Sequence, residues 1–211
     1  MDKSSLNFVV MVKLKNDLDD KFLSLIRNFV SAIKLEDGCL DCECLKTSND
    51  GKMILFQESW NSISQASETQ IAQLHIDYLV EMAKGAILQQ DFEVSTWFLA
   101  SDIPPKFRNS ENHFSFLLER TAKKGREKEI RLLFEKIIDI SMIETECLSY
   151  CLYINSLGEM DKFLLLGTWL DKNSWQRHHH AEYMQNFIFC EELSLIMNVQ
   201  KPTIKEVQRV L

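Results

Sequence analysis

Apolar and polar residues alternate at the start of the chain and again about a hundred residues later. Each stretch is typical of a half-buried strand, the first over residues 6–14 and the second from residue 114. Apolar residues at the three-to-four-residue spacing of an amphipathic helix follow in residues 22–33 and 130–140. A hairpin, a second helix and a last strand complete each half. The pattern predicts the order β-α-β-β-α-β twice, which is a ferredoxin-like unit in tandem.

An internal repeat agrees with this order. The segment CLDCECL at 39–45 is echoed by CLSYCLY at 147–153, an offset of 108 residues, whereas Trp60 and Trp169 lie 109 residues apart. We expect the additional residue in the hairpin turn between the two strands, because turns accept insertions.

The strongest linker signal is the polar stretch 101–111, which contains two adjacent prolines. It predicts a first unit over residues 1–100, a linker over 101–111 and a second unit over 112–211.

Several predicted strands are apolar on both faces, in residues 8–12, 53–56 and 163–166. An antiparallel sheet with helices on one face only should alternate more cleanly, so something must cover the second face. The other repeat is the simplest cover. The expected fold class is therefore α+β: two tandem ferredoxin-like units packed sheet to sheet as a barrel-like body, an intrachain pseudo-dimer for which a further homodimer stays open.

Composition narrows the classes of partner. A net charge of −7 without a Lys/Arg cluster argues against nucleic acid and against anionic membrane surfaces. The chain starts without a signal-peptide pattern, and no apolar run approaches the roughly 18–20 residues that span a bilayer. We expect a soluble, cytoplasmic protein whose six cysteines remain thiols.

Two clusters invite a metal interpretation, and neither has suitable geometry. The consecutive histidines 178–180 would point about 100° apart on a helix and could not converge on one ion. Cys39, Cys42 and Cys44 lie within a predicted strand, where the first points to the opposite face from the other two. No metal and no cofactor is expected, and no phosphate or dinucleotide motif occurs.

Short motifs recur at matching places in the two halves. The first half carries Gly38-Cys39-Leu40, Glu58-Ser59-Trp60 and a helix with Gln70 and His75; the second carries Glu146-Cys147-Leu148, Gly167-Thr168-Trp169 and a helix with three histidines. With these motifs the chain resembles the dimeric α+β barrel proteins of the antibiotic biosynthesis monooxygenase (ABM) type.

The resemblance implies cofactor-independent oxygenation of a small aromatic or polycyclic phenolic substrate between sheet and helices. The side chains implied for the site are Trp60, His75, Trp169 and His179. Aromatic rings would pack the planar substrate, and histidines would stabilise the developing oxyanion. Among the three consecutive histidines, His179 lies closest to the apolar helix stripe that contains Trp175 and Tyr183.

Other functions stay open. A non-enzymatic small-molecule-binding or interaction protein is the main alternative, because Phe56 and Leu165 stand where oxygenases of this type often have Asn. A small-molecule isomerase or a heme-degrading relative is a further alternative, although Asn7 lies too early on its strand for the heme-degrading motif. Each tryptophan could also serve only the core.

Overall fold

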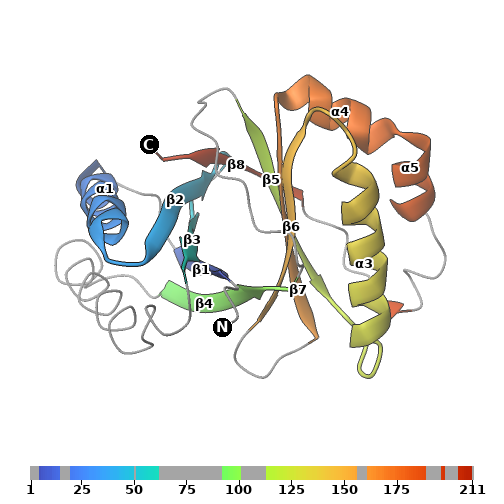
Figure 1. Ribbon diagram of the computed structural model, residues 1–211, viewed down its shortest axis with the longest axis horizontal. Helices are drawn as coiled ribbons and strands as arrows, with labels where there is room; N and C mark the ends of the chain where they lie inside the picture. The colour runs from blue at the N-terminus through green and yellow to red at the C-terminus, as the bar shows by residue number, and fades with distance from the viewer. Residues whose placement is uncertain are drawn as a thin grey trace. The chain divides into compact units, whose positions relative to one another are not determined.

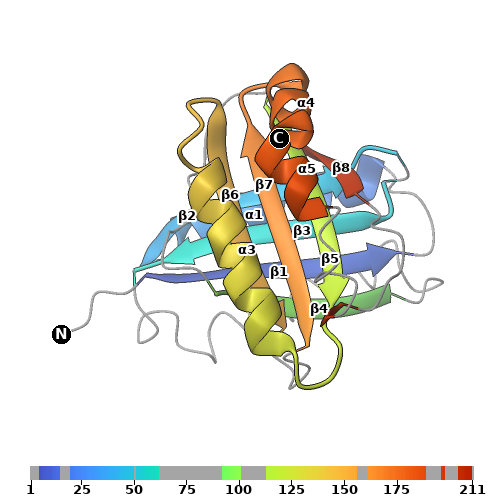
Figure 2. The same cartoon turned by 90° about the vertical axis from the view of Figure 1, so that its right-hand side faces the viewer.

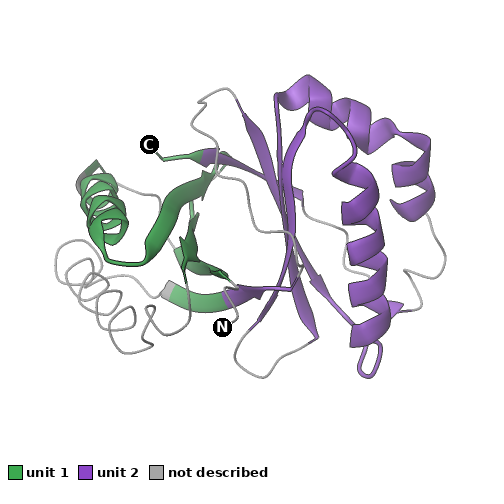
Figure 3. Cartoon of the chain, viewed as in Figure 1, with its two compact units in different colours: residues 1–96, 209–211 green, residues 97–208 purple. Residues whose placement is uncertain are grey.

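Residues 1–96 and 209–211 form one unit of the computed structural model, and residues 97–208 form a second (Figure 3). The structure describes residues 5–14, 20–49, 51–61, 92–100, 113–155, 161–188, 196–197 and 204–210. The predicted linker 101–111 and His75 lie outside these ranges.

The first unit contains an antiparallel sheet and a helix (Figure 1). Its elements are β1 (Leu6–Leu14), α1 (Asp20–Leu35), β2 (Cys39–Thr47), β3 (Met53–Trp60) and the first part of β4 (Phe92–Leu99). Strand β3 pairs with both β1 and β2. Apolar residues of α1 pack on one face of these strands, because the helical and strand periods each gather their apolar side chains on one side.

The second unit contains β5 (Phe114–Thr121), α3 (Glu127–Ser141), β6 (Cys147–Asn155), β7 (Lys162–Trp169), α4 (Lys172–His180), α5 (Glu182–Ile188) and most of β8 (Ile204–Arg209). Strand β5 pairs with β7 and β8, and β7 also pairs with β6. The helices α3, α4 and α5 lie on one face of this sheet (Figure 2). Their side chains and those of the sheet form one apolar cluster.

The unit boundaries depart from the predicted halves at two places. Residues 97–99 of β4 pair with β6 and so group with the second unit. At the other end, the backbone N–H of Val210 donates to the carbonyl of Cys44 at 2.9 Å, which joins residues 209–211 to the first unit. Hydrogen bonding between strands therefore sets these boundaries, and the position of the two adjacent prolines in the sequence does not predict them.

The two halves repeat each other in register. Cys39 pairs with Trp60 and Cys147 with Trp169, and the same irregularity follows each cysteine. The additional residue lies between the two strands of the hairpin, as the sequence predicts. The first hairpin strands, β2 and β6, end at residues 47 and 155, which are 108 apart, whereas the second strands, β3 and β7, begin at residues 53 and 162, which are 109 apart. The helices bury matching positions, Phe22, Ile26, Phe29, Val30 and Ile33 in α1 and Ile130, Phe134, Ile137, Ile138 and Ser141 in α3, each pair 108 residues apart.

The predicted α+β class is confirmed, and the described strand pairs are antiparallel. Strands β1 and β7 are buried on both faces. Val9 of β1 and Leu164 of β7 lie outside the two helix-facing clusters, yet they are as inaccessible to solvent as the members of those clusters. Among the described helices, none is long and apolar enough to cross a membrane.

Candidate active site

Three side chains of the second unit converge on the carboxylate of Glu144. The Tyr183 hydroxyl donates to Oε1, and Trp169 Nε1 donates to Oε2 at 3.5 Å. His178 Nδ1 lies 3.3 Å from Oε1 and 3.2 Å from Oε2, and 2.9 Å from the Tyr183 hydroxyl oxygen. Glu144 therefore orients a histidine, a tyrosine and a tryptophan at once.

Local structure brings these groups together. Glu144 lies in the turn between α3 and β6, where its N–H donates to the Ser141 carbonyl and its own carbonyl accepts from Cys147 N–H, both at 3.1 Å. Helix α4 begins at Asp171, whose carboxylate accepts from the Ser174 N–H at 2.7 Å and its hydroxyl at 2.8 Å. Ser174 and His178, four residues apart, are the buried positions of α4.

A break between two helices positions Tyr183. Ala181 leaves the helical conformation (φ −60°, ψ 141°), so α4 ends at His180 and α5 begins at Glu182. Because of this break, Tyr183 does not continue the face of α4. Its hydroxyl instead reaches both His178 and Glu144.

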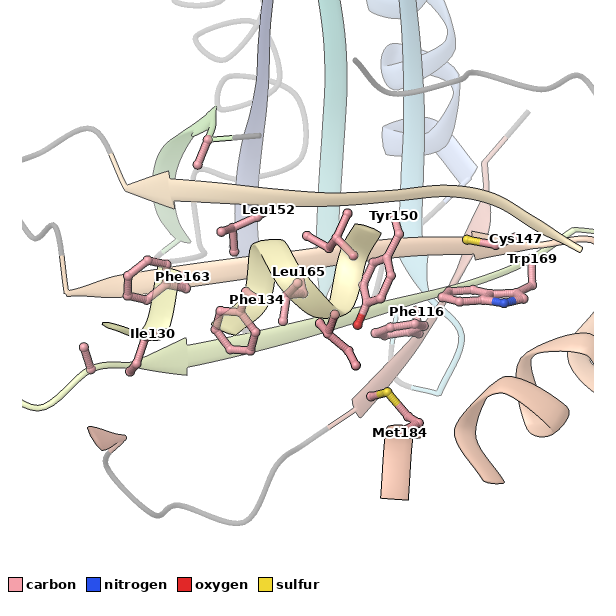
Figure 4. Close-up of a cluster of buried hydrophobic side chains, with 14 of the residues drawn as sticks. Phe116, Ile130, Phe134, Cys147, Tyr150, Leu152, Phe163, Leu165, Trp169 and Met184 are labelled. Atoms are coloured by element: carbon pink, nitrogen blue, oxygen red, sulfur yellow. The ribbon is translucent and has the colours of Figure 1, made fainter. Parts of the chain in front are cut away.

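Gly167 provides the space for Trp169. A Cβ atom at residue 167 would lie 2.4 Å from Cζ3 of the Trp169 ring and 2.7 Å from Cε1 of Phe116, so the indole lies directly over this glycine. Phe116 stacks on Trp169 with ring centroids 5.4 Å apart, and Tyr150 meets it edge-on at 5.3 Å (Figure 4). The His178 ring lies 4.5 Å from the same indole.

Burial sets the protonation state of His178, whose side chain is 1% exposed. Desolvation lowers the pKa of His178 below its ordinary 6.5, although Glu144 acts to raise it. We assign the proton of the neutral imidazole to Nδ1, because this nitrogen faces the acceptor oxygens of Glu144. Nε2 is then an unprotonated, buried nitrogen without a hydrogen-bond partner in the described structure.

The two tyrosines remain phenols. Burial raises the pKa of Tyr150, and burial together with the bond to Glu144 raises the pKa of Tyr183. The site therefore combines one basic nitrogen, one carboxylate and neutral aromatic rings.

The predicted site residues have different surroundings. Trp169 is part of the cluster, but His179 is half-buried and stacks on Trp175, with centroids 5.2 Å apart and planes 13° apart. His178 occupies the buried position instead. In the first unit, Trp60 is buried and its Nε1 donates to Glu58 Oε2 at 3.0 Å.

Sequence reasoning missed Glu144, Tyr150 and His178 and treated Tyr183 as a stripe residue only. The Asp171 cap was a usable signal, because it fixes the first turn of α4 and hence which of the three histidines faces inward. The helix break at Ala181 carries neither Gly nor Pro, so no residue type marked it.

Within the described ranges, no three His, Cys, Asp or Glu side chains gather as metal ligands would. Cys39, Cys42, Cys44, Cys147 and Cys151 are free thiols. Burial raises the pKa of Cys39 and of Cys151 to about 11, which leaves both thiols protonated and poorly nucleophilic at neutral pH.

A comparison with known families finds a match within the second unit. Residues 114–188 match the family model described as antibiotic biosynthesis monooxygenase. This segment contains Glu144, Trp169, His178 and Tyr183. The resemblance predicted from the sequence is thereby confirmed for these residues, which are similar to this monooxygenase family.

Solved structures resemble nearly the whole chain. A candidate monooxygenase from Fusobacterium nucleatum subsp. nucleatum has a TM-score of 0.75 at 18% identity, over 100% of this chain and 94% of its own. A candidate monooxygenase from Lactobacillus acidophilus has a TM-score of 0.69 at 13% identity, over 99% and 95%. An anthrone oxidase-like protein has a TM-score of 0.64 at 11% identity, over 100% and 92%. At these identities the likeness shows a shared fold, and no curated protein matches the sequence.

Replacing Tyr183 with phenylalanine tests the bond to Glu144. We expect the variant to lower the free energy of unfolding by about 1–2 kcal/mol, because a partly buried carboxylate loses one donor. Urea denaturation followed by tryptophan fluorescence measures the change. The same substitution in a Glu144→Gln background should cost less; an equal cost in both backgrounds would mean that the bond does not stabilise the fold.

Proposed function

We propose that the chain is a cofactor-independent monooxygenase whose active site lies in the second unit, around His178, Glu144 and Trp169. The observation that carries the proposal is the neutral, fully buried imidazole of His178, which a carboxylate holds at Nδ1 and which has no hydrogen-bond partner at Nε2 among the described residues. The family match over residues 114–188 supports oxygenation as the reaction class. The fold shared with an anthrone oxidase-like protein supports an anthrone-like or phenolic substrate.

In this proposal His178 is the general base. Nε2 accepts a proton from an acidic C–H or O–H of the substrate, and Glu144 stabilises the resulting imidazolium. The substrate anion gives one electron to O₂, and the two radicals combine into a peroxide. Cleavage of its O–O bond converts the CH₂ group and O₂ into a carbonyl group and water, so atoms and electrons balance without a cofactor.

The aromatic rings would hold a planar substrate. Trp169, Phe116 and Tyr150 already contact one another through stacked and edge-on geometries, which are the arrangements that polycyclic rings favour. Because these rings exclude water, the attraction between imidazolium and carboxylate is stronger than it would be in solvent.

We assign the chemistry to the second half only. Where the second half has Gly167, the first has Glu58, whose carboxylate binds the indole of Trp60. Trp60 therefore serves the core in this proposal, and His179 at most borders the site. His75 remains a proposed site residue, with the role in stabilising an oxyanion that the resemblance to the family implies.

The arrangement of two tandem ferredoxin-like units packed sheet to sheet is part of the same proposal. The matching buried positions of α1 and α3 support it, as do strands that are buried on both faces. The similarity to solved structures over the whole chain also supports it.

Oxygen consumption with anthrone tests the proposal. We expect the purified protein to consume one O₂ per anthrone and to form anthraquinone, detected by its absorbance, in the presence of a metal chelator. The control is heat-denatured protein, which reports spontaneous oxidation. A rate equal to that control would contradict the proposal, and quinone binding without oxygen uptake would favour the non-enzymatic alternative.

A further inference from the structure

Arg120 occupies an apolar position of the second unit. On β5, Phe114, Phe116 and Leu118 face the helices, and Ala122 continues the same alternation after the strand. Arg120 lies between Leu118 and Ala122 in this series, and its partner across the sheet is the buried Phe163. An arginine therefore stands where the pattern calls for a core residue.

The guanidinium of Arg120 has no carboxylate partner among the described residues. Its described hydrogen bond runs from Nη1 to the backbone carbonyl of Glu119 at 2.9 Å, and no acidic side chain within the described structure forms an ion pair with it. The side chain is half-buried, and desolvation lowers its pKa. A partly desolvated cation without an anion is costly unless something supplies the anion.

The first unit provides an internal comparison. Val12 precedes Arg120 by 108 residues and pairs with Ile54, as Arg120 pairs with Phe163. Val12 is 3% exposed and belongs to the apolar cluster of its unit. The first unit therefore accepts a small apolar residue at this position, so this place in the strand does not by itself require an arginine.

Arg120 is also linked to the candidate active site. Tyr150 lies close enough to interact electrostatically with Arg120, since each acts on the pKa of the other. The Tyr150 ring contacts Phe116, Trp169 and His178. A rigid aromatic ligand that packs along Tyr150 would therefore lie near both His178 and the guanidinium of Arg120.

We propose that Arg120 binds an anionic group of an aromatic ligand, a carboxylate or phenolate, and so selects acidic polycyclic substrates for the site around His178. This inference rests on the proposed function for its substrate. The planar guanidinium suits a carboxylate, because two N–H groups can donate to its two oxygens. The fully buried Tyr150 keeps the rest of the ligand among aromatic rings.

A matched pair of ligands tests the charge preference. Anthraquinone-2-carboxylate and anthraquinone-2-carboxamide share shape and differ in charge, and quenching of tryptophan fluorescence reports their binding. We expect the wild type to bind the carboxylate about tenfold more tightly than the amide, the usual effect of a charge-assisted bond. Arg120→Gln should lose this preference and keep its affinity for the amide, and Arg120→Lys should retain part of the preference.

Arg126→Gln is the control, because Arg126 is an exposed arginine paired with Glu129. An unchanged preference in Arg120→Gln, equal binding of both ligands by the wild type, or binding of neither would overturn the inference. Oxygen uptake with uncharged anthrone separates it from the proposed function. Oxygen uptake without a charge preference in binding would support the proposed oxygenase and contradict the role of Arg120. A charge preference without oxygen uptake would support the role of Arg120 in binding and contradict the oxygenase.

Discussion

His178→Ala is expected to slow oxygen uptake with anthrone by about 10²–10⁴-fold, the usual contribution of a positioned general base. The reason is the geometry of the imidazole: Nδ1 faces Glu144, and Nε2 is buried without a hydrogen-bond partner in the part of the chain that the structure describes. Alanine removes the only neutral nitrogen of the described cluster that can accept a proton. Initial rates measured with an oxygen electrode at saturating anthrone give the ratio.

His179→Ala is the matched control. His179 is the neighbouring histidine on the same helix, but it stacks on Trp175 and does not touch Glu144. This variant should keep the wild-type rate within about threefold, as expected for a residue outside the proton transfer. If His179→Ala lowered the rate of oxygen uptake and His178→Ala did not, the result would favour His179, the site residue predicted from the sequence. Added imidazole should partly rescue His178→Ala, since it can fill the space that the substitution leaves.

The lowered pKa of His178 predicts two pH dependences. Because the base must be neutral, the rate should stay high at pH 6.5 and fall only at lower pH, as the imidazole becomes protonated. Stability has the same sign: the unfolded chain binds more protons than the folded one between the lowered pKa and 6.5. The contribution of His178 is thus complete above pH 6.5 and is lost as the pH falls. His178→Gln should remove both dependences.

The sequence predicts the fold well where periodicity decides it. The helix stripes at 22–33 and 130–140 bury most of the residues that their spacing indicates, although Ile140 is exposed and Ser141 is buried beside it. The offsets of 108 and 109 place the hairpin insertion correctly. Both are consequences of backbone geometry, which repeats regularly along a helix or a strand. The exchange of residues 97–99 and 209–211 between units depends on long-range strand pairing, which leaves no mark in local pattern.

The site was predictable only in part. Trp169 could be found because a motif recurs with it, whereas Glu144 lies in a turn and its role depends on three partners distant in the chain. The choice of His179 over His178 assumed one continuous helix through Tyr183. The break at Ala181 changes which residues share a face, and it leaves His178 at the buried position of α4 and His179 half-buried.

Gly167→Ala is expected to lower the free energy of unfolding by about 1–3 kcal/mol, the usual cost of an added methyl group in a packed core. The new Cβ would lie 2.4 Å from the Trp169 ring and 2.7 Å from Phe116. Neither ring can easily give way, because Phe116 also packs on Tyr150 and Trp175. Urea denaturation measures the loss, and oxygen uptake should fall as well, since a tilted indole moves Nε1 away from Glu144.

The double variant Gly167→Ala with Trp169→Phe separates the clash from other effects of the substitution. Phenylalanine lacks the outer edge of the indole, where Cζ3 and Cη2 meet the new methyl group. The cost of Gly167→Ala should therefore be much smaller in the Trp169→Phe background, with a coupling of about 1 kcal/mol or more between two residues in contact. Additive costs would contradict the close packing of Trp169 on Gly167. They would also remove the reason why a glycine in the second half stands where the first half has Glu58.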